Sequence, residues 1–149
     1  MEALYGYYAA ADDQDASRAV WLTSGETSGD GFDQILVQNI DPNVDLLPVE
    51  FAVTGRPASV IKSDPRHGRV VAALEDGEVV CVSLTDAFRD AFAGIGQDFL
   101  HDVARGWARS ARFTTPPDIE QLDRFLQQLA ALAERAVARG HGLYCWIRR

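Results

Sequence analysis

Three residues with the spacing of metal ligands lie within about one helical turn of each other. Asp98, His101 and Asp102 occupy positions i, i+3 and i+4. Groups at this spacing share one helix face and can hold a divalent cation when another element supplies a further ligand. The same residues also fit the solvated face of an amphipathic helix, opposite Phe99 and Val103. Since that simpler interpretation suffices, we predict no metal site and no bound cofactor.

A glycine-rich segment from Gly25 to Gly31 resembles a short segment seen in some nucleotide-sugar glycosyltransferases. Such a loop cradles phosphate when a strand precedes it, a helix N-terminus follows it and a basic residue lies nearby. Here a predicted helix precedes the segment, and Glu26, Asp30 and Asp33 would repel an anion. The segment is therefore predicted to be a surface loop.

The two cysteines, Cys81 and Cys145, each lie in an apolar, β-like run. A nucleophilic thiol needs a base or a helix N-terminus to lower its pKa, and the interior of a strand supplies neither. His67 and His141 are isolated in the sequence and have no nearby partner for acid–base chemistry. The chain also contains no G-x-S-x-G, H-E-x-x-H, Walker or C-x-x-C motif. We predict no catalytic residue, and an enzymatic role stays an open alternative.

Length and composition are those of one ordinary domain covering residues 1–149. The chain is 47% hydrophobic, and no apolar run approaches the roughly 18 to 20 residues of a membrane span. Its first residues are acidic where a signal peptide is basic. We therefore expect a cytoplasmic protein that does not enter the membrane.

The formal charge of −8 is concentrated in the first fifty residues, where Arg18 is the one basic residue. The C-terminal third has only a mild basic excess, so we predict no nucleic-acid binding. An acidic surface can instead be a solvated face or a site for a basic protein partner. A homodimer is a further alternative. The candidate contacts for a partner are Asp12, Asp13, Asp15, Glu26, Asp30 and Asp33.

The predicted elements follow from periodicity and capping residues. Residues 4–8 and 143–147 are aromatic and alternating, which predicts strands at both ends, and Asp76-Gly77 between two β-branched runs predicts a hairpin. A short strand is expected at 35–37. Asp41-Pro42 predicts the start of a helix that Pro48 kinks and Gly55 ends, with Phe51 on its apolar face. The predicted helices cover residues 16–22, 42–54, 86–93, 97–112 and 118–139. Thr85-Asp86 is expected to cap the third of these, and the last is expected to start at Asp118 and to end at Gly140.

Together these elements predict an α+β fold in a single domain. The sheet is small and mainly antiparallel, with the N-terminal strand, the central hairpin and the C-terminal strand, and four to five helices cover it. Trp146 is expected to be buried against the long helix that precedes the last strand.

The order of these pieces resembles a group of small uncharacterised bacterial proteins related to the YfbM-like families of unknown function. The resemblance rests on the Leu-Tyr-Gly-Tyr-Tyr strand at residues 4–8, the segment from Ile40 to Gly55, the hairpin, and the long helix leading into Leu143-Tyr144-Cys145-Trp146. It implies a fold and no activity.

Two function classes follow. The first is a non-enzymatic interaction domain, in its sharper form an immunity-type or antitoxin-like protein that neutralises a basic toxin. The second is a small-molecule-binding or minor enzymatic domain with an aromatic-lined pocket near Tyr7, Trp107 and Trp146. A concave pocket with converging polar groups would favour the second class, and a flat acidic patch would favour the first.

Overall fold

One antiparallel sheet organises the chain. The computed structural model describes residues 3–22, 33–74, 77–110 and 117–148. Within them five strands pair in the order β2-β1-β5-β4-β3, so the first and last strands are neighbours inside the sheet. This confirms the predicted α+β class, the antiparallel sheet and the membership of both terminal strands. The strands are β1 (Leu4–Ala10), β2 (Gln34–Gln38), β3 (Val70–Ala73), β4 (Val79–Ser83) and β5 (Gly142–Arg148).

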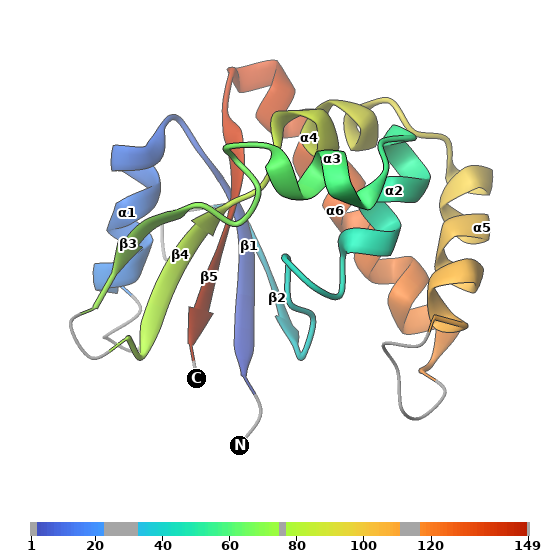
Figure 1. Cartoon of the computed structure of the whole chain (residues 1–149), viewed down its shortest axis with the longest axis horizontal. Coiled ribbons are helices and arrows are strands. Elements are labelled where there is room, and N and C mark those ends of the chain that lie inside the picture. The colour runs from blue at the N-terminus through green and yellow to red at the C-terminus, as the bar shows by residue number, and fades with distance from the viewer. Residues whose placement is uncertain (1–2, 23–32, 75–76, 111–116, 149) are drawn as a thin grey trace.

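Helices cover the two faces of the sheet unequally. Helix α1 lies on one face, and the larger helical layer lies on the other (Figure 1). The long α6 packs against α4 and α5 in that layer. Within the described residues the helices are α1 (Asp13–Leu22), α2 (Leu47–Thr54), α3 (Ala58–Ser63), α4 (Asp86–Ala93), α5 (Gln97–Ala108) and α6 (Ile119–Arg139).

Alternation along the two central strands creates two separate cores. Successive side chains of a strand point to opposite faces, so Tyr7 and Cys145 join the core under the helical layer. Tyr8 and Tyr144 join the core on the α1 side. Two of the buried tyrosine hydroxyls donate to backbone carbonyls: Tyr7 donates to the carbonyl of Ile40, and Tyr8 donates to the carbonyl of Ala16 at 2.7 Å.

Trp146 is fully buried, as predicted, but the predicted packing partner is wrong. Its ring lies in the core on the α1 side with Tyr8 and Val20. Side chains along a strand alternate between its two faces. The residues next to Trp146 in β5 therefore point toward α6, and Trp146 points toward α1. Its indole nitrogen donates to Oε1 of Gln34 at 3.1 Å. A Cβ added to Gly6 would lie 2.2 Å from the ring, so glycine at this position makes room for it.

The predicted start of the second helix is also wrong. Helix α2 begins at Leu47, and Pro48 lies in its first turn instead of kinking it. Proline suits that turn because its missing N–H would have no partner there anyway. Asp41 caps the preceding turn, where its Oδ1 accepts the N–H of Asn43 at 2.7 Å. Phe51, expected on the buried face, is 53% exposed.

Other local predictions are confirmed. The Thr85 hydroxyl accepts the N–H of Phe88 at the start of α4, and Asp118 caps α6 in the same way. Gly140 ends α6 with φ of 70°. The hairpin forms between β3 and β4, although residues 75 and 76 of its turn lie outside the described part. Two helices differ from the predictions: α5 ends at Ala108, earlier than predicted, and α3 was not predicted from the sequence.

The contact between Gly6 and Trp146 gives the first prediction. Trp146→Ala should lower the free energy of unfolding by about 3 to 5 kcal/mol. Gly6→Ala should lower it by about 1 to 3 kcal/mol through overpacking. In a Trp146→Leu background the Gly6→Ala change should be less destabilising, since the shorter side chain leaves space for the new methyl group. Urea denaturation of the wild type, Gly6→Ala, Trp146→Leu and the double variant measures the coupling free energy. If the two single changes in unfolding free energy simply added up in the double variant, the contact would be contradicted.

Candidate functional site

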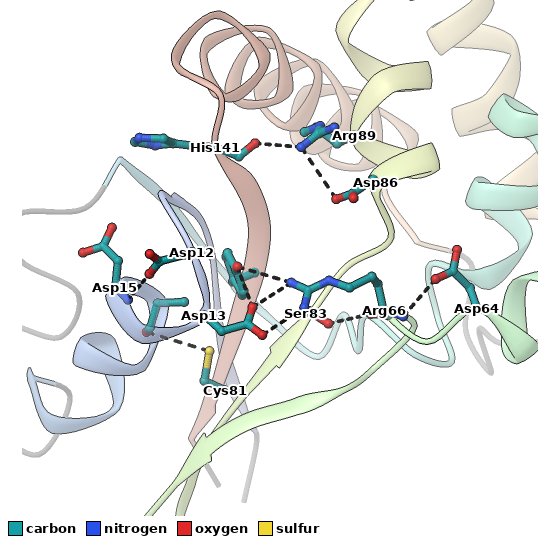
Figure 2. Close-up of polar contacts among 12 residues, drawn as sticks. Asp12, Asp13, Asp15, Asp64, Arg66, Cys81, Ser83, Asp86, Arg89 and His141 are labelled. Atoms are coloured by element: carbon teal, nitrogen blue, oxygen red, sulfur yellow. Dashed lines mark hydrogen bonds and ion pairs between the residues drawn. The ribbon is translucent and has the colours of Figure 1, made fainter.

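A polar cleft lies at one end of the sheet, and Arg66 is at its centre. Arg66 lies in the turn that follows α3, and both its backbone N–H and its backbone carbonyl are hydrogen-bonded. Its N–H donates to Oδ1 of Asp64 at 2.8 Å, and its carbonyl accepts the hydroxyl of Ser83 at 2.6 Å (Figure 2). These bonds fix the backbone from which the guanidinium group extends.

The Arg66 guanidinium makes a bidentate ion pair with Asp13. Nη1 donates to Oδ2 at 3.0 Å and Nη2 to Oδ1 at 2.9 Å. The Tyr144 hydroxyl donates to Oδ1 of Asp13 at 2.8 Å and accepts from Nη2 of Arg66 at 3.2 Å. The three residues therefore tie together α1, the turn after α3 and the last strand (Figure 2). Bidentate, charge-assisted bonds of this kind are strong and directional.

This network fixes the protonation state of the site. The hydrogen bond from Arg66 holds the pKa of the Asp13 carboxyl below its usual value. Burial, together with the bond to Asp13, raises the pKa of Tyr144 above that of an ordinary phenol. At neutral pH the site therefore presents a carboxylate, a guanidinium and a neutral phenol. It is arranged to hold these charges in place.

A second arginine faces the same cleft from α4. Arg89 donates from Nη1 to the carbonyl of His141 at 3.0 Å and from Nε to Oδ1 of Asp90 at 2.9 Å. Its Nη1 is also 3.6 Å from Oδ1 of Asp86. The cleft has a volume of about 500 Å³. Its lining residues are Ala11, Asp12, Asp13, Gln14, Arg66, Asp86, Arg89, Gly140, Gly142 and Tyr144.

An apolar groove of about 310 Å³ opens between α2 and α5, in the helical layer. Phe99 at its edge is 47% exposed, whereas Trp107 is buried and donates its indole N–H to the carbonyl of Asp45 at 2.9 Å. The groove is lined mainly by apolar side chains, whereas the polar cleft is lined by aspartates and arginines. Its lining residues are Pro48, Val49, Ala52, Phe99, Asp102, Val103, Gly106 and Trp107.

The structure does not bring the three predicted pocket aromatics together. Tyr7 and Trp107 both pack against Phe125, with ring centroids 5.3 Å and 6.3 Å away. Trp146 lies on the opposite face of the sheet. Strand alternation separates it from the other two, and Phe125 fills the space between them. Of the three, only Trp107 lines the groove between α2 and α5.

Most of the predicted acidic contacts that the structure describes are paired within the chain. Asp13 binds Arg66, and Asp15 binds Arg18 at 2.6 Å. Asp33 accepts a hydrogen bond from Nη2 of Arg135 at 2.9 Å and lies 3.9 Å from Nη1 of Arg139. Asp12 accepts the backbone N–H of Asp15 at the start of α1. Glu26, Asp30 and the loop from 25 to 31 lie outside the described residues.

Two of the three residues with metal-ligand spacing, His101 and Asp102, have other partners. His101 Nδ1 lies 2.9 Å from Oδ2 of Asp123 on α6, and Asp102 pairs with Arg105. Among the residues described, no group of three histidine, cysteine, aspartate or glutamate side chains could hold a metal ion.

Sequence reasoning did not single out the arginines that build the cleft. Arg66 and its partner Asp13 are 53 residues apart, and Arg89 and His141 are 52 apart. The available signal was the short basic run Arg66-His67-Gly68-Arg69 directly after Asp64-Pro65, in a chain with a net charge of −8.

Comparisons with known proteins leave the identity of the chain open: no family model, no curated protein and no solved structure matches it. The relationship to the YfbM-like families therefore stays a prediction. In the described part of the chain, no helix has the length and apolar character needed to cross a membrane.

The Asp13–Arg66 pair predicts a specific pH dependence of stability. Because the folded pKa of Asp13 is depressed, the pair contributes fully above the ordinary aspartate pKa of about 3.9 and is lost as the pH falls through the folded value. In Asp13→Asn, the free energy of unfolding should therefore fall less steeply below about pH 5 than in the wild type. Arg66→Met should flatten the curve in the same way. Urea titrations across this range measure it, and an unchanged slope in both variants would contradict the assignment.

Both cysteines should be unreactive in the folded protein. Cys81 and Cys145 are fully buried. Burial raises the pKa of Cys81 to about 12 and that of Cys145 well above its usual value. With a thiol-specific chromogenic reagent at about pH 8, labelling should be slow and should follow unfolding. Chain unfolded in guanidinium should label rapidly at both positions, and rapid labelling of the native protein would show that a thiol is accessible.

Proposed function

We propose that the protein is an interaction domain whose docking surface is the apolar groove between α2 and α5. The observation that supports this is the exposure of two large aromatic side chains beside the groove: Phe51 is 53% exposed and Phe99 is 47% exposed. Phe51 is three residues from Pro48 and therefore shares a face of α2 with this groove residue. A cluster of exposed apolar side chains around a concavity is typical of a binding surface.

The groove suits the apolar face of a partner helix. Its volume of about 310 Å³ accommodates one or two large side chains, and its floor is formed by Val49, Val103 and Trp107. Helix-in-groove recognition uses anchors of this kind, spaced three and four residues apart. We expect affinity to come mainly from burying these anchors together with the two exposed phenylalanines.

Charge selects the kind of partner. The chain carries a net charge of −8, and Asp98 and Asp102 flank Phe99 on α5. A helix with basic residues beside its apolar face would complement this surface, and long-range attraction would speed its association. Asp13, Asp15 and Asp33 contribute less to this attraction, because each already binds an arginine of the same chain. An immunity-type or antitoxin-like role in the cytoplasm is the sharper form of this proposal.

A small-molecule domain with an aromatic-lined pocket has less support. That hypothesis needs Tyr7, Trp107 and Trp146 to line one space, and they lie in two cores on opposite faces of the sheet.

A matched pair of variants tests the groove. Basic amphipathic peptides selected from a displayed helical library would serve as probes. Phe99→Asp should weaken their binding at least tenfold, because it places a charge where an apolar anchor docks. Val137→Asp on α6 is the control, since Val137 is 46% exposed and lies outside the groove. Calorimetric titration measures both affinities, and thermal melts confirm that both variants fold.

Three outcomes would contradict the proposal. The first is equal loss of binding in the two variants. The second is unchanged binding in Phe99→Asp. The third is a homodimer in sedimentation experiments that dissociates on Phe99→Asp, because the groove would then hold a second copy of this chain.

A further inference from the structure

We infer that the polar cleft around Arg66 and Arg89 binds a small zwitterion, a molecule with one carboxylate and one ammonium group, such as a free amino acid. This site is separate from the groove between α2 and α5 and shares no lining residue with it. Its volume of about 500 Å³ is in the range of small-molecule sites.

The two arginines supply a prepared carboxylate site. Arg66 is held by Asp13 and Tyr144, and Arg89 by Asp90 and the carbonyl of His141, so both guanidinium planes are fixed. Figure 2 shows the contacts of Arg66 with Asp13 and of Arg89 with His141. Among the described residues, Nη2 of Arg89 has no protein acceptor. A fixed guanidinium with donors to spare can bind a carboxylate with little loss of side-chain entropy.

Carboxylates on two other walls supply the ammonium site. Asp12 lines the cleft at the start of α1, where one of its oxygens, Oδ1, accepts the N–H of Asp15. Asp86 lines it from the first turn of α4, with a side chain that is 62% exposed and 3.6 Å from Arg89. That distance is that of an ion pair without a hydrogen bond, so Asp86 can accept a hydrogen bond from a second cationic partner.

The mixture of charges selects a ligand that carries both signs. A simple anion in the cleft would meet three carboxylates, those of Asp12, Asp13 and Asp86. A simple cation would meet the guanidinium groups of Arg66 and Arg89. A zwitterion can place its carboxylate at Arg89 and its ammonium group at Asp12 or Asp86. It therefore gains two charge-assisted contacts where each simple ion gains one and is repelled elsewhere.

Two residues of β5, Gly142 and Tyr144, line the cleft side by side. Gly142 and Tyr144 are two residues apart in β5 and therefore share a face of the strand. A Cβ built on Gly142 would lie 3.4 Å from the Tyr144 ring, an ordinary contact. A larger residue at position 142 would thus add bulk beside the Tyr144 ring in the cleft without removing any charged group.

Titration with simple probes tests the inference. The zwitterion is L-alanine, the anion is propionate, the cation is ethylammonium and the neutral molecule is glucose. L-alanine should cause saturable shifts in amide NMR signals of cleft residues such as Gln14 and Gly142, with a Kd on the order of mM. Propionate, ethylammonium and glucose should each bind at least tenfold more weakly.

Three variants locate the site. Arg89→Met should reduce alanine affinity at least tenfold. Arg105→Met should leave it unchanged, because Arg105 pairs with Asp102 on α5, away from the cleft. Gly142→Val should block alanine sterically, and it keeps the inference testable if loss of Arg89 unfolds the chain. Alanine shifts that never saturate, propionate binding as tight as alanine, or full binding in Gly142→Val would overturn the inference.

Discussion

The antiparallel pairing of β1 with β5 is the constraint on which the rest of the structure depends. It joins the two ends of the chain, from Leu4 opposite Arg148 to Ala10 opposite Gly142. Both strands have a helix-covered face on each side, so their alternating side chains supply both cores. The pairing therefore connects the α1 layer to the larger helical layer. Because β1 and β5 lie inside the sheet, their pairing also sets the positions of β2 on one side and of β4 and β3 on the other.

The register of this pair also sets the chemistry of the polar cleft. A shift of one residue would exchange the faces of a strand, and Tyr144 would then leave the side where Asp13 lies. The Gly6–Trp146 contact specifies the register, because the ring fits over a residue that lacks a side chain. Core packing and the polar cleft thus depend on the same alignment.

The apolar groove and the polar cleft have different surface properties. On the side of the larger helical layer, α2 and α5 leave an apolar groove with exposed aromatic residues at its edge. At the end where α1, α4 and β5 meet, arginines and aspartates alternate around a cleft. Burial of apolar area and pairing of fixed charges favour different partners, so the two surfaces can act independently.

The sequence by itself determined the features that depend on neighbouring residues. The α+β class, the hairpin, the caps at Thr85 and Asp118 and the helix end at Gly140 all follow from local periodicity and capping. Only the tertiary structure decided which face of β5 meets α1, that Phe51 is exposed, and that Asp13 and Asp33 bind Arg66 and Arg135. The physical reason is separation along the chain: these partners are 53 and 102 residues apart, and no local pattern records which distant charge or ring a side chain will meet.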